Sequence, residues 1–193
     1  MTRPPLIYCA SPSRATDCLR QGEIVTGLEQ FRLRLDTIGT AVVQGDLVRH
    51  PYAIIVSQDC DLEQDFRARQ GGNAPDKLVP GTLFCEVATA EEVRGKEEMN
   101  STLWRPVPTN KNERYHFLQR VDASCDAVQI GVVELVVDFK RYFTLPTDEV
   151  YHRIARGEAK RRCVLVSPYL EHFSTRFAHF LSRVALPQDH ASD

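Results

Sequence analysis

The clearest apolar run in the chain is Tyr-Ala-Ile-Ile-Val at residues 52–56, which has no polar alternation. A short run of this kind is typical of a strand that is covered on both faces or that lines a closed barrel. Polar residues follow it directly, in the order Ser57, Gln58, Asp59, Cys60 and Asp61. The pattern predicts a buried strand that delivers polar groups to one edge of a sheet.

Shorter apolar groups separated by turn residues predict the rest of this sheet. Strands are expected at 23–25, 41–43, 83–87, 115–118 and 142–145, and a further strand is expected at 163–166. The β-branched segment 128–139 contains Gly131 and predicts a hairpin or a bulged strand. Residues 63–82 are rich in charges, glycine and proline and are expected to form an exposed loop, and 100–112 is expected to be irregular.

Three helices are also expected. Thr89 is a good N-cap for a helix that ends near Gly95, and Thr147 is a good N-cap for one that closes at Gly157. Ser167 and Pro168 predict the start of a longer helix that Pro187 stops. Its apolar stripe predicts docking on the core, with binding to a partner as the alternative, and consists of Leu170, Phe173, Phe177, Leu181 and Val184.

Length and composition indicate one α+β domain over residues 1–193, since 42% of the residues are hydrophobic. We expect a bent antiparallel, SH3-like barrel sheet over 20–145, a helical C-terminal extension over 146–187 and a polar tail over 188–193. No apolar run approaches the roughly 20 residues that a membrane helix needs, and the N-terminus lacks a signal-peptide pattern. The protein is therefore expected to be cytoplasmic, without membrane contact.

The six cysteines are far apart, and none forms a C-x-x-C pair: Cys9, Cys18, Cys60, Cys85, Cys125 and Cys163. We therefore expect no disulfide, no zinc site and no cofactor. Two alternatives stay open. Asp59, Cys60 and Asp61 could supply metal ligands together with a distant histidine, and Cys60 could act as a nucleophile with His116 or His172 as its base.

Charge is distributed unevenly along the chain. Residues 1–139 hold 15 basic and 20 acidic side chains, whereas 140–187 holds nine basic and four acidic ones. This C-terminal third is the candidate for contact with phosphates or with an acidic partner, although a solvated surface would have the same composition. The candidate nucleic-acid-binding cations are Lys140, Arg141, Lys160, Arg161, Arg162 and Arg176.

Two stretches carry a resemblance to a known family. Gly22-Glu-Ile-Val, followed later by Pro51-Tyr-Ala-Ile-Ile-Val-Ser, resembles the opening of MazF/PemK-type toxins, in which a Gly-Asp-Ile-Val strand precedes an Arg-Pro-x-Val-Val-Leu-Ser strand. The resemblance covers the first third of the chain. It implies an SH3-like barrel and cleavage of single-stranded RNA by a dimer. Ser57 matches the family's catalytic hydroxyl residue, while His50 stands where the catalytic arginine would be and Arg49 lies one place early.

Cleavage of RNA needs a base, an acid and cations for the phosphate charge. The candidate catalytic residues near the apolar strand are His50, Ser57, Asp59 and Asp61. The two aspartates could instead bond backbone N–H groups in a turn. Two functions are therefore open: a nucleic-acid-associated protein of toxin or defence type, with possible endoribonuclease activity, or a non-enzymatic interaction module that docks a larger protein partner. The partners expected are RNA or single-stranded nucleic acid, a protein partner or a homodimer. An enzyme should gather the four residues in one cleft, whereas a docking module should expose apolar side chains beside them.

Overall fold

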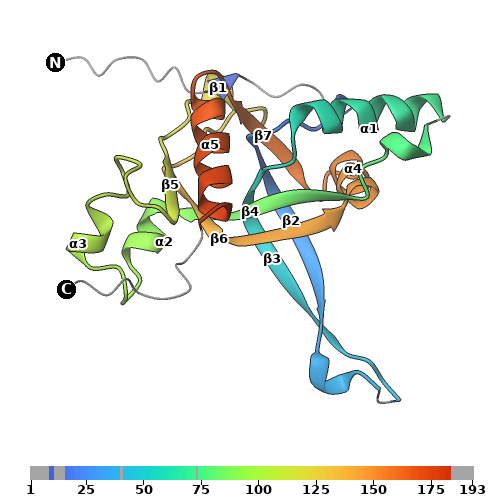
Figure 1. Ribbon diagram of the computed structural model, residues 1–193, viewed down its shortest axis with the longest axis horizontal. Coiled ribbons are helices and arrows are strands. Elements are labelled where there is room, and N and C mark those ends of the chain that lie inside the picture. The colour runs from blue at the N-terminus through green and yellow to red at the C-terminus, as the bar shows by residue number, and fades with distance from the viewer. Residues whose placement is uncertain (1–8, 11–15, 40, 73, 184–193) are drawn as a thin grey trace, which may run out of the picture.

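The computed structural model describes residues 9–10, 16–39, 41–72 and 74–183 (Figure 1). An antiparallel sheet forms the centre of the molecule, with strand order β1-β7-β2-β3-β4-β6-β5. The strands are β1 (Cys9–Ala10), β2 (Glu23–Leu33), β3 (Gly45–Ile55), β4 (Gly81–Thr89), β5 (Tyr115–Leu118), β6 (Leu135–Pro146) and β7 (Lys160–Leu165). The α+β class and the antiparallel pairing predicted from the sequence are therefore confirmed.

The sheet is open rather than closed into a barrel, which corrects the sequence-based prediction. Within the described residues, β1 and β5 are the two outermost strands and do not pair with each other. The strand predicted at 163–166 is present as β7, but it pairs with β2 inside the sheet instead of belonging to a separate helical extension. The C-terminal third therefore completes the sheet.

Apolar cores lie on both faces of the sheet. One contains Phe173 and Phe177 of α5 (Tyr169–Leu181) with Ile54 of β3. The other contains Val150 and Ile154 of α4 (Thr147–Ala155), together with the neighbouring β3 residues 53 and 55 and one residue of α1 (Asp59–Gly71). Because successive strand residues point to opposite faces, α5 and α4 cover different sides of the sheet (Figure 1).

A third apolar cluster lies at the β5 end of the sheet. It is formed around α2 (Ala90–Arg94) and includes Met99, Val107 and Phe117. As expected, Thr89 caps α2: its hydroxyl accepts a bond from the N–H of Glu92, whose side chain accepts one from the N–H of Thr89. The chain leaves α2 at Gly95, again as expected.

Helix α1 occupies much of the segment that was predicted to be an exposed loop. Its composition is polar, and its buried residues are only Leu62, Asp65 and Ala68. The Asp65 carboxylate accepts bonds from Arg69 Nε at 2.7 Å and from the backbone N–H of Val79 at 2.8 Å. The contact with Val79 joins α1 to a segment 14 residues away, which apolar periodicity could not reveal.

Other differences concern strand and helix limits. Residues 41–43 are not a strand, and 142–145 continues β6 instead of pairing beside it. Residues 128–134 lie outside β6, and the irregular 100–112 segment contains the one-turn helix α3 (Ser101–Trp104). The N-cap positions of α4 and α5 are Pro146 and Pro168, so Thr147 and Ser167 are not the caps. Val184 and the polar tail lie outside the described residues.

Candidate functional site

The four candidate catalytic residues are not gathered in one cleft. His50 lies within β3, five residues before the strand ends at Ile55, whereas Ser57 follows that end. An extended chain rises about 3.3 Å per residue, so His50 and Ser57 are separated by roughly 20 Å. The geometry consequently gives the endoribonuclease hypothesis no support from these residues.

His50 is a buried residue. Its ring is stacked on that of Phe143 with the centroids 3.7 Å apart, and Nδ1 lies 3.7 Å from a carboxylate oxygen of Glu86. Nε2 is the one buried side-chain polar atom without a hydrogen-bond partner among the described residues. Burial lowers the pKa of the His50 imidazole, against the opposing effect of the Glu86 carboxylate. His50 therefore packs as a neutral ring.

Ser57, Asp59 and Asp61 have three different environments. The Ser57 hydroxyl accepts a bond from the N–H of Leu83 at 2.9 Å, which ties the end of β3 to β4. Asp59 accepts a bond from the N–H of Gln21 at 2.6 Å and forms a two-point ion pair with Arg20. Asp61 is exposed in the first turn of α1. The first two side chains hold distant segments together.

Removal of the Asp59 carboxylate is expected to cost stability. Asp59→Ala should lower the free energy of unfolding by about 1–2 kcal/mol, because it deletes charge-assisted bonds to Arg20 and Gln21. Asp61→Ala, two residues along the same helix, should change it by less than about 0.5 kcal/mol. Urea unfolding at pH 7 measures both values, and equal effects of the two substitutions would contradict this assignment.

Three of the six candidate nucleic-acid-binding cations are occupied within the fold. Arg161 and Arg162 are each 5% exposed, and they pair with the carboxylates of Glu23 and Asp126 respectively. Arg176 is partly buried and donates to Asn110 Oδ1, His116 Nδ1 and the carbonyl oxygens of Asn112 and Tyr115. Lys140, Arg141 and Lys160 are exposed, and Arg141 donates to Glu86 at 3.2 Å.

The groups considered for metal binding or cysteine chemistry are also placed by the structure. Among the described residues, no group of three or more His, Cys, Asp or Glu side chains is arranged to hold a metal ion. The Cys60 thiol is exposed and contacts Gln58 and Asp61. His116 lies with α5 and Phe139 instead, 2% exposed. The side chain of Cys9 lies outside the described residues.

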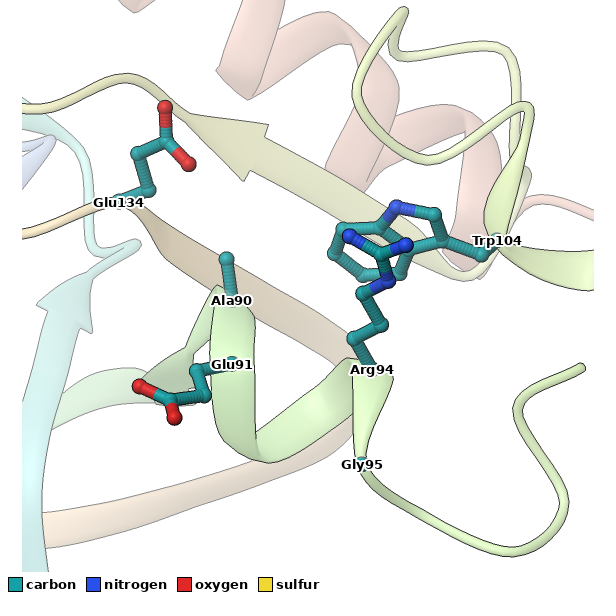
Figure 2. Close-up of a pocket in the computed structure, with 6 residues that line it drawn as sticks. All are labelled: Ala90, Glu91, Arg94, Gly95, Trp104 and Glu134. Carbon is teal, nitrogen blue, oxygen red and sulfur yellow. The ribbon is translucent and has the colours of Figure 1, made fainter. Parts of the chain in front are cut away.

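A shallow cleft of about 430 Å³ lies beside α2 and α3. Figure 2 shows Arg94 and Trp104 at one side of it, and Glu91 and Glu134 at the other. A partly buried indole beside a cation can stack on a planar ring. The cleft is open to solvent, however, and the unpartnered buried nitrogen found among the described residues, His50 Nε2, does not line it.

The largest feature absent from the sequence-based interpretation is a long two-stranded arm. The pairing of β2 with β7 ends at Thr26, and that of β3 with β4 ends at Tyr52. Beyond these points β2 and β3 pair with each other out to Leu33 and Gly45. Figure 1 shows this ribbon extending away from the rest of the molecule, with the short helix η1 (Leu35–Thr37) near its tip. We call residues 28–50 the arm.

The register gives the arm one apolar face. Phe31 lies opposite Leu47, and Leu33 lies opposite Gly45. The backbone bond from Arg34 N–H to the Gln44 carbonyl continues the ladder by one step, and the extended backbone of Arg34 puts Leu35, the first residue of η1, on the same side as Leu33. The ring of Phe31 lies across the ribbon against Gly45. A Cβ atom at position 45 would come within 2.2 Å of Phe31 Cζ, so the absence of a side chain there makes room for the ring. The alternate positions form the polar face: Gln30, Arg32, Arg34, Gln44, Asp46 and the partly buried Val48.

The apolar side chains of the arm are strongly exposed. Half of the fourteen exposed large apolar side chains among the described residues lie between positions 31 and 47. Their exposed fractions are Phe31 63%, Leu33 49%, Leu35 80%, Ile38 57%, Val42 67%, Val43 54% and Leu47 52%. The sequence contains a signal for this face, because apolar and basic residues alternate strictly from position 31 to 35, as they do in a strand with one apolar side.

The root of the arm is fixed to the body of the protein. Glu29 lies opposite Arg49 and pairs with it at 3.2 Å, and it also lies 3.5 Å from Arg153 of α4. His50, opposite Leu28, is held by Phe143 and Glu86. The arm is thus anchored through charged and aromatic contacts at one end, while its apolar face is presented to solvent.

A comparison with models of known protein families gives no match, and a comparison with curated proteins gives none either. Among the described residues, no helix has both the length and the apolar character needed to span a bilayer.

Proposed function

We propose that this protein is a non-enzymatic interaction module that docks a protein partner through the apolar face of its arm. The exposed apolar face carries this proposal, since monomeric soluble proteins rarely expose contiguous apolar patches without a binding role. For a docking module the sequence predicts exposed apolar side chains beside the four candidate catalytic residues, whereas this face lies further out along the arm, between positions 31 and 47.

The arm has enough apolar surface for a specific interface. Complete burial of a Val, Leu, Ile or Phe side chain removes roughly 60–120 Å² from water. The seven exposed apolar side chains of the arm, which include Ile38 and Val42 near its tip as well as those of the apolar face, are about half exposed or more and therefore offer roughly 300–400 Å² per arm. A standard interface buries about 800 Å² per partner, of which roughly 60% is apolar. The arm supplies most of that apolar area.

The charge of the arm favours a protein over a nucleic acid. Residues 28–49 contain Arg32, Arg34 and Arg49, balanced by Glu29, Asp36 and Asp46. Phosphate backbones attract surfaces with an excess of cations, because binding releases condensed counterions. A neutral ribbon with an apolar face suits an apolar protein surface instead.

Binding of RNA or single-stranded nucleic acid, endoribonuclease activity and a cytoplasmic location stay predictions from the sequence. For nucleic acid, the exposed cations among the original candidates are Lys140, Arg141 and Lys160. Such binding would be supported if the affinity for RNA fell with rising salt, and if Lys140→Ala and Lys160→Ala each made this salt dependence less steep.

Site-specific photo-crosslinking in living cells tests the docking function. A photoreactive phenylalanine analogue replaces Leu33 on the apolar face, and the matched control replaces Arg32 on the polar face of the same strand. We expect discrete protein adducts from position 33 and few from position 32, because only the apolar face would be covered.

The adducts are identified by mass spectrometry. A second protein or a second copy of this chain, crosslinked from position 33 alone, supports the docking function. Absence of protein adducts at position 33, or equal adducts from both positions, would overturn it.

A further inference from the structure

We infer that the partner of the arm is a second copy of this chain, and that two arms lie antiparallel with their apolar faces together. This inference rests on the proposed docking function and names its partner. A two-fold dimer uses the same surface on both subunits, so that surface must be complementary to itself. The apolar face of the arm meets this condition.

Charge is the first reason. The register places Phe31 and Leu33 of β2 and Gly45 and Leu47 of β3 on this face, and Leu35 and Val43, which flank these strand ends, are apolar as well. The charged residues at its root, Glu29 and Arg49, are of opposite sign and pair with each other. Two copies of the face can therefore meet without like charges opposing each other, which would otherwise be costly at an interface.

Shape is the second reason. In an antiparallel pair with its two-fold axis at the level of Leu33, this residue lies against its own copy, and Phe31 lies against Leu35 of the second copy. The large ring near the root of one arm thus meets a smaller side chain near the tip of the other. The two ribbons pack as stacked sheets, about 10 Å apart.

The body of the protein excludes the parallel alternative. Two arms pointing in the same direction would bring the two bodies together at their roots. Cores with α4 and α5 lie on different faces of the sheet, so the body is thicker than the arm on both sides. The bodies would collide before two parallel arms came within 10 Å. Antiparallel arms place each body beyond the tip of the other arm.

Sedimentation equilibrium of the full chain gives the first test. We expect the wild type to sediment with twice the 21.9 kDa mass of the chain. Phe31→Asp should raise the dissociation constant about 100-fold or more, as expected for a central apolar anchor. Gln30→Asp introduces the same charge on the polar face of the same strand and should change it less than about threefold. Far-UV circular dichroism verifies that both variants are folded.

Crosslinking gives the second test and determines the orientation. In a Cys60→Ser background, which removes the exposed thiol of α1, we introduce Phe31→Cys or Leu35→Cys and add a short bismaleimide. Antiparallel arms place the two copies of position 31 roughly 13 Å apart along the arm. Each variant alone should therefore crosslink poorly, whereas an equimolar mixture should form a heterodimer joined between positions 31 and 35.

Each outcome has a definite meaning. Dimers that lose affinity with Phe31→Asp, together with crosslinking in the mixture only, support the inference. Strong crosslinking of Phe31→Cys alone would overturn the antiparallel arrangement. A chain that remains monomeric at about 100 μM, or a dimer that Phe31→Asp leaves intact, would overturn self-association through the arm. Adducts of position 33 with another protein would then still support the docking function.

Discussion

Arg161→Ala should lower the free energy of unfolding by about 3–5 kcal/mol, because it leaves the Glu23 carboxylate buried without its cationic partner. Glu23 is fully buried, and both of its oxygens accept bonds from the Arg161 guanidinium. The guanidinium also donates to the carbonyl oxygens of Asp17 and Cys18, at 3.0 and 2.9 Å. Loss of Arg161 therefore disturbs the entry to β2 as well as the ion pair.

The pH dependence of this effect has a defined sign. Burial raises the pKa of Glu23, and the Arg161 guanidinium opposes that rise. Without Arg161 the pKa of Glu23 rises further, so the folded variant favours the protonated carboxyl. A group whose pKa is raised in the folded state contributes stability at low pH, and this contribution is lost as pH rises through that pKa. The free energy of unfolding that Arg161→Ala loses relative to wild type should therefore be larger at pH 8 than at pH 5.

Urea unfolding at the two pH values measures the deficit. Lys160→Ala is the control, since Lys160 is the exposed neighbour on the same strand and should contribute less than about 0.5 kcal/mol. Similar losses for both substitutions would contradict the burial of Arg161. Because Arg161→Ala is strongly destabilising, reduced nucleic-acid binding by this variant would not identify Arg161 as a phosphate ligand.

His116 should make the protein sensitive to acid. The imidazole is 2% exposed, and Nδ1 lies 2.8 Å from Arg176 Nη1. Burial, reinforced by the charge of Arg176, lowers the pKa of His116 to about 3. Unfolded chains have an imidazole pKa near 6.5, so the stability that neutral His116 contributes is present above pH 6.5 and is lost as pH falls toward 3. The expected slope is about 1.4 kcal/mol per pH unit.

His116→Asn tests this dependence, because asparagine can accept a bond from Arg176 but does not titrate. The difference in unfolding free energy between wild type and variant should shrink by about 2–3 kcal/mol between pH 7.5 and pH 4.5. The exposed His179, replaced by asparagine, serves as the control and should leave the acid dependence of wild type unchanged. A difference that is constant with pH would show that His116 does not have a depressed pKa.

The burial of two candidate phosphate-binding cations could not be predicted from the local sequence pattern. Lys160, Arg161 and Arg162 form a run of cations that suggests a phosphate-binding surface. In the structure they belong to β7, and consecutive strand residues point to opposite faces. Arg161 and Arg162 therefore enter different regions of the interior, where carboxylates from distant parts of the chain meet them: Glu23, 138 positions away, and Asp126, 36 positions away.

The residues after the apolar strand show a related limit. Ser57 and Asp59 were correctly placed at the end of a buried strand, but their partners lie on other segments, at Leu83 and Gln21. The role of such a side chain depends on which segment arrives beside it. The arm differs for another reason. The predicted strand covers only 23–25, whereas β2 continues to Leu33, through the alternation of apolar and basic residues that begins at position 31.

The sequence by itself determined the features that depend on neighbours a few positions away: the β5 strand at 115–118, the capping of α2 by Thr89, the apolar stripe that includes Phe173 and Phe177, and the antiparallel α+β class. Periodicity and capping are local, so they survive without knowledge of the fold. Only the tertiary structure decided that the sheet stays open, that the polar segment from Asp59 to Gly71 is helical, and which cations are buried. Those outcomes depend on burial and on pairing between groups that are far apart in the chain, because the energy of a charge is determined by what surrounds it after folding.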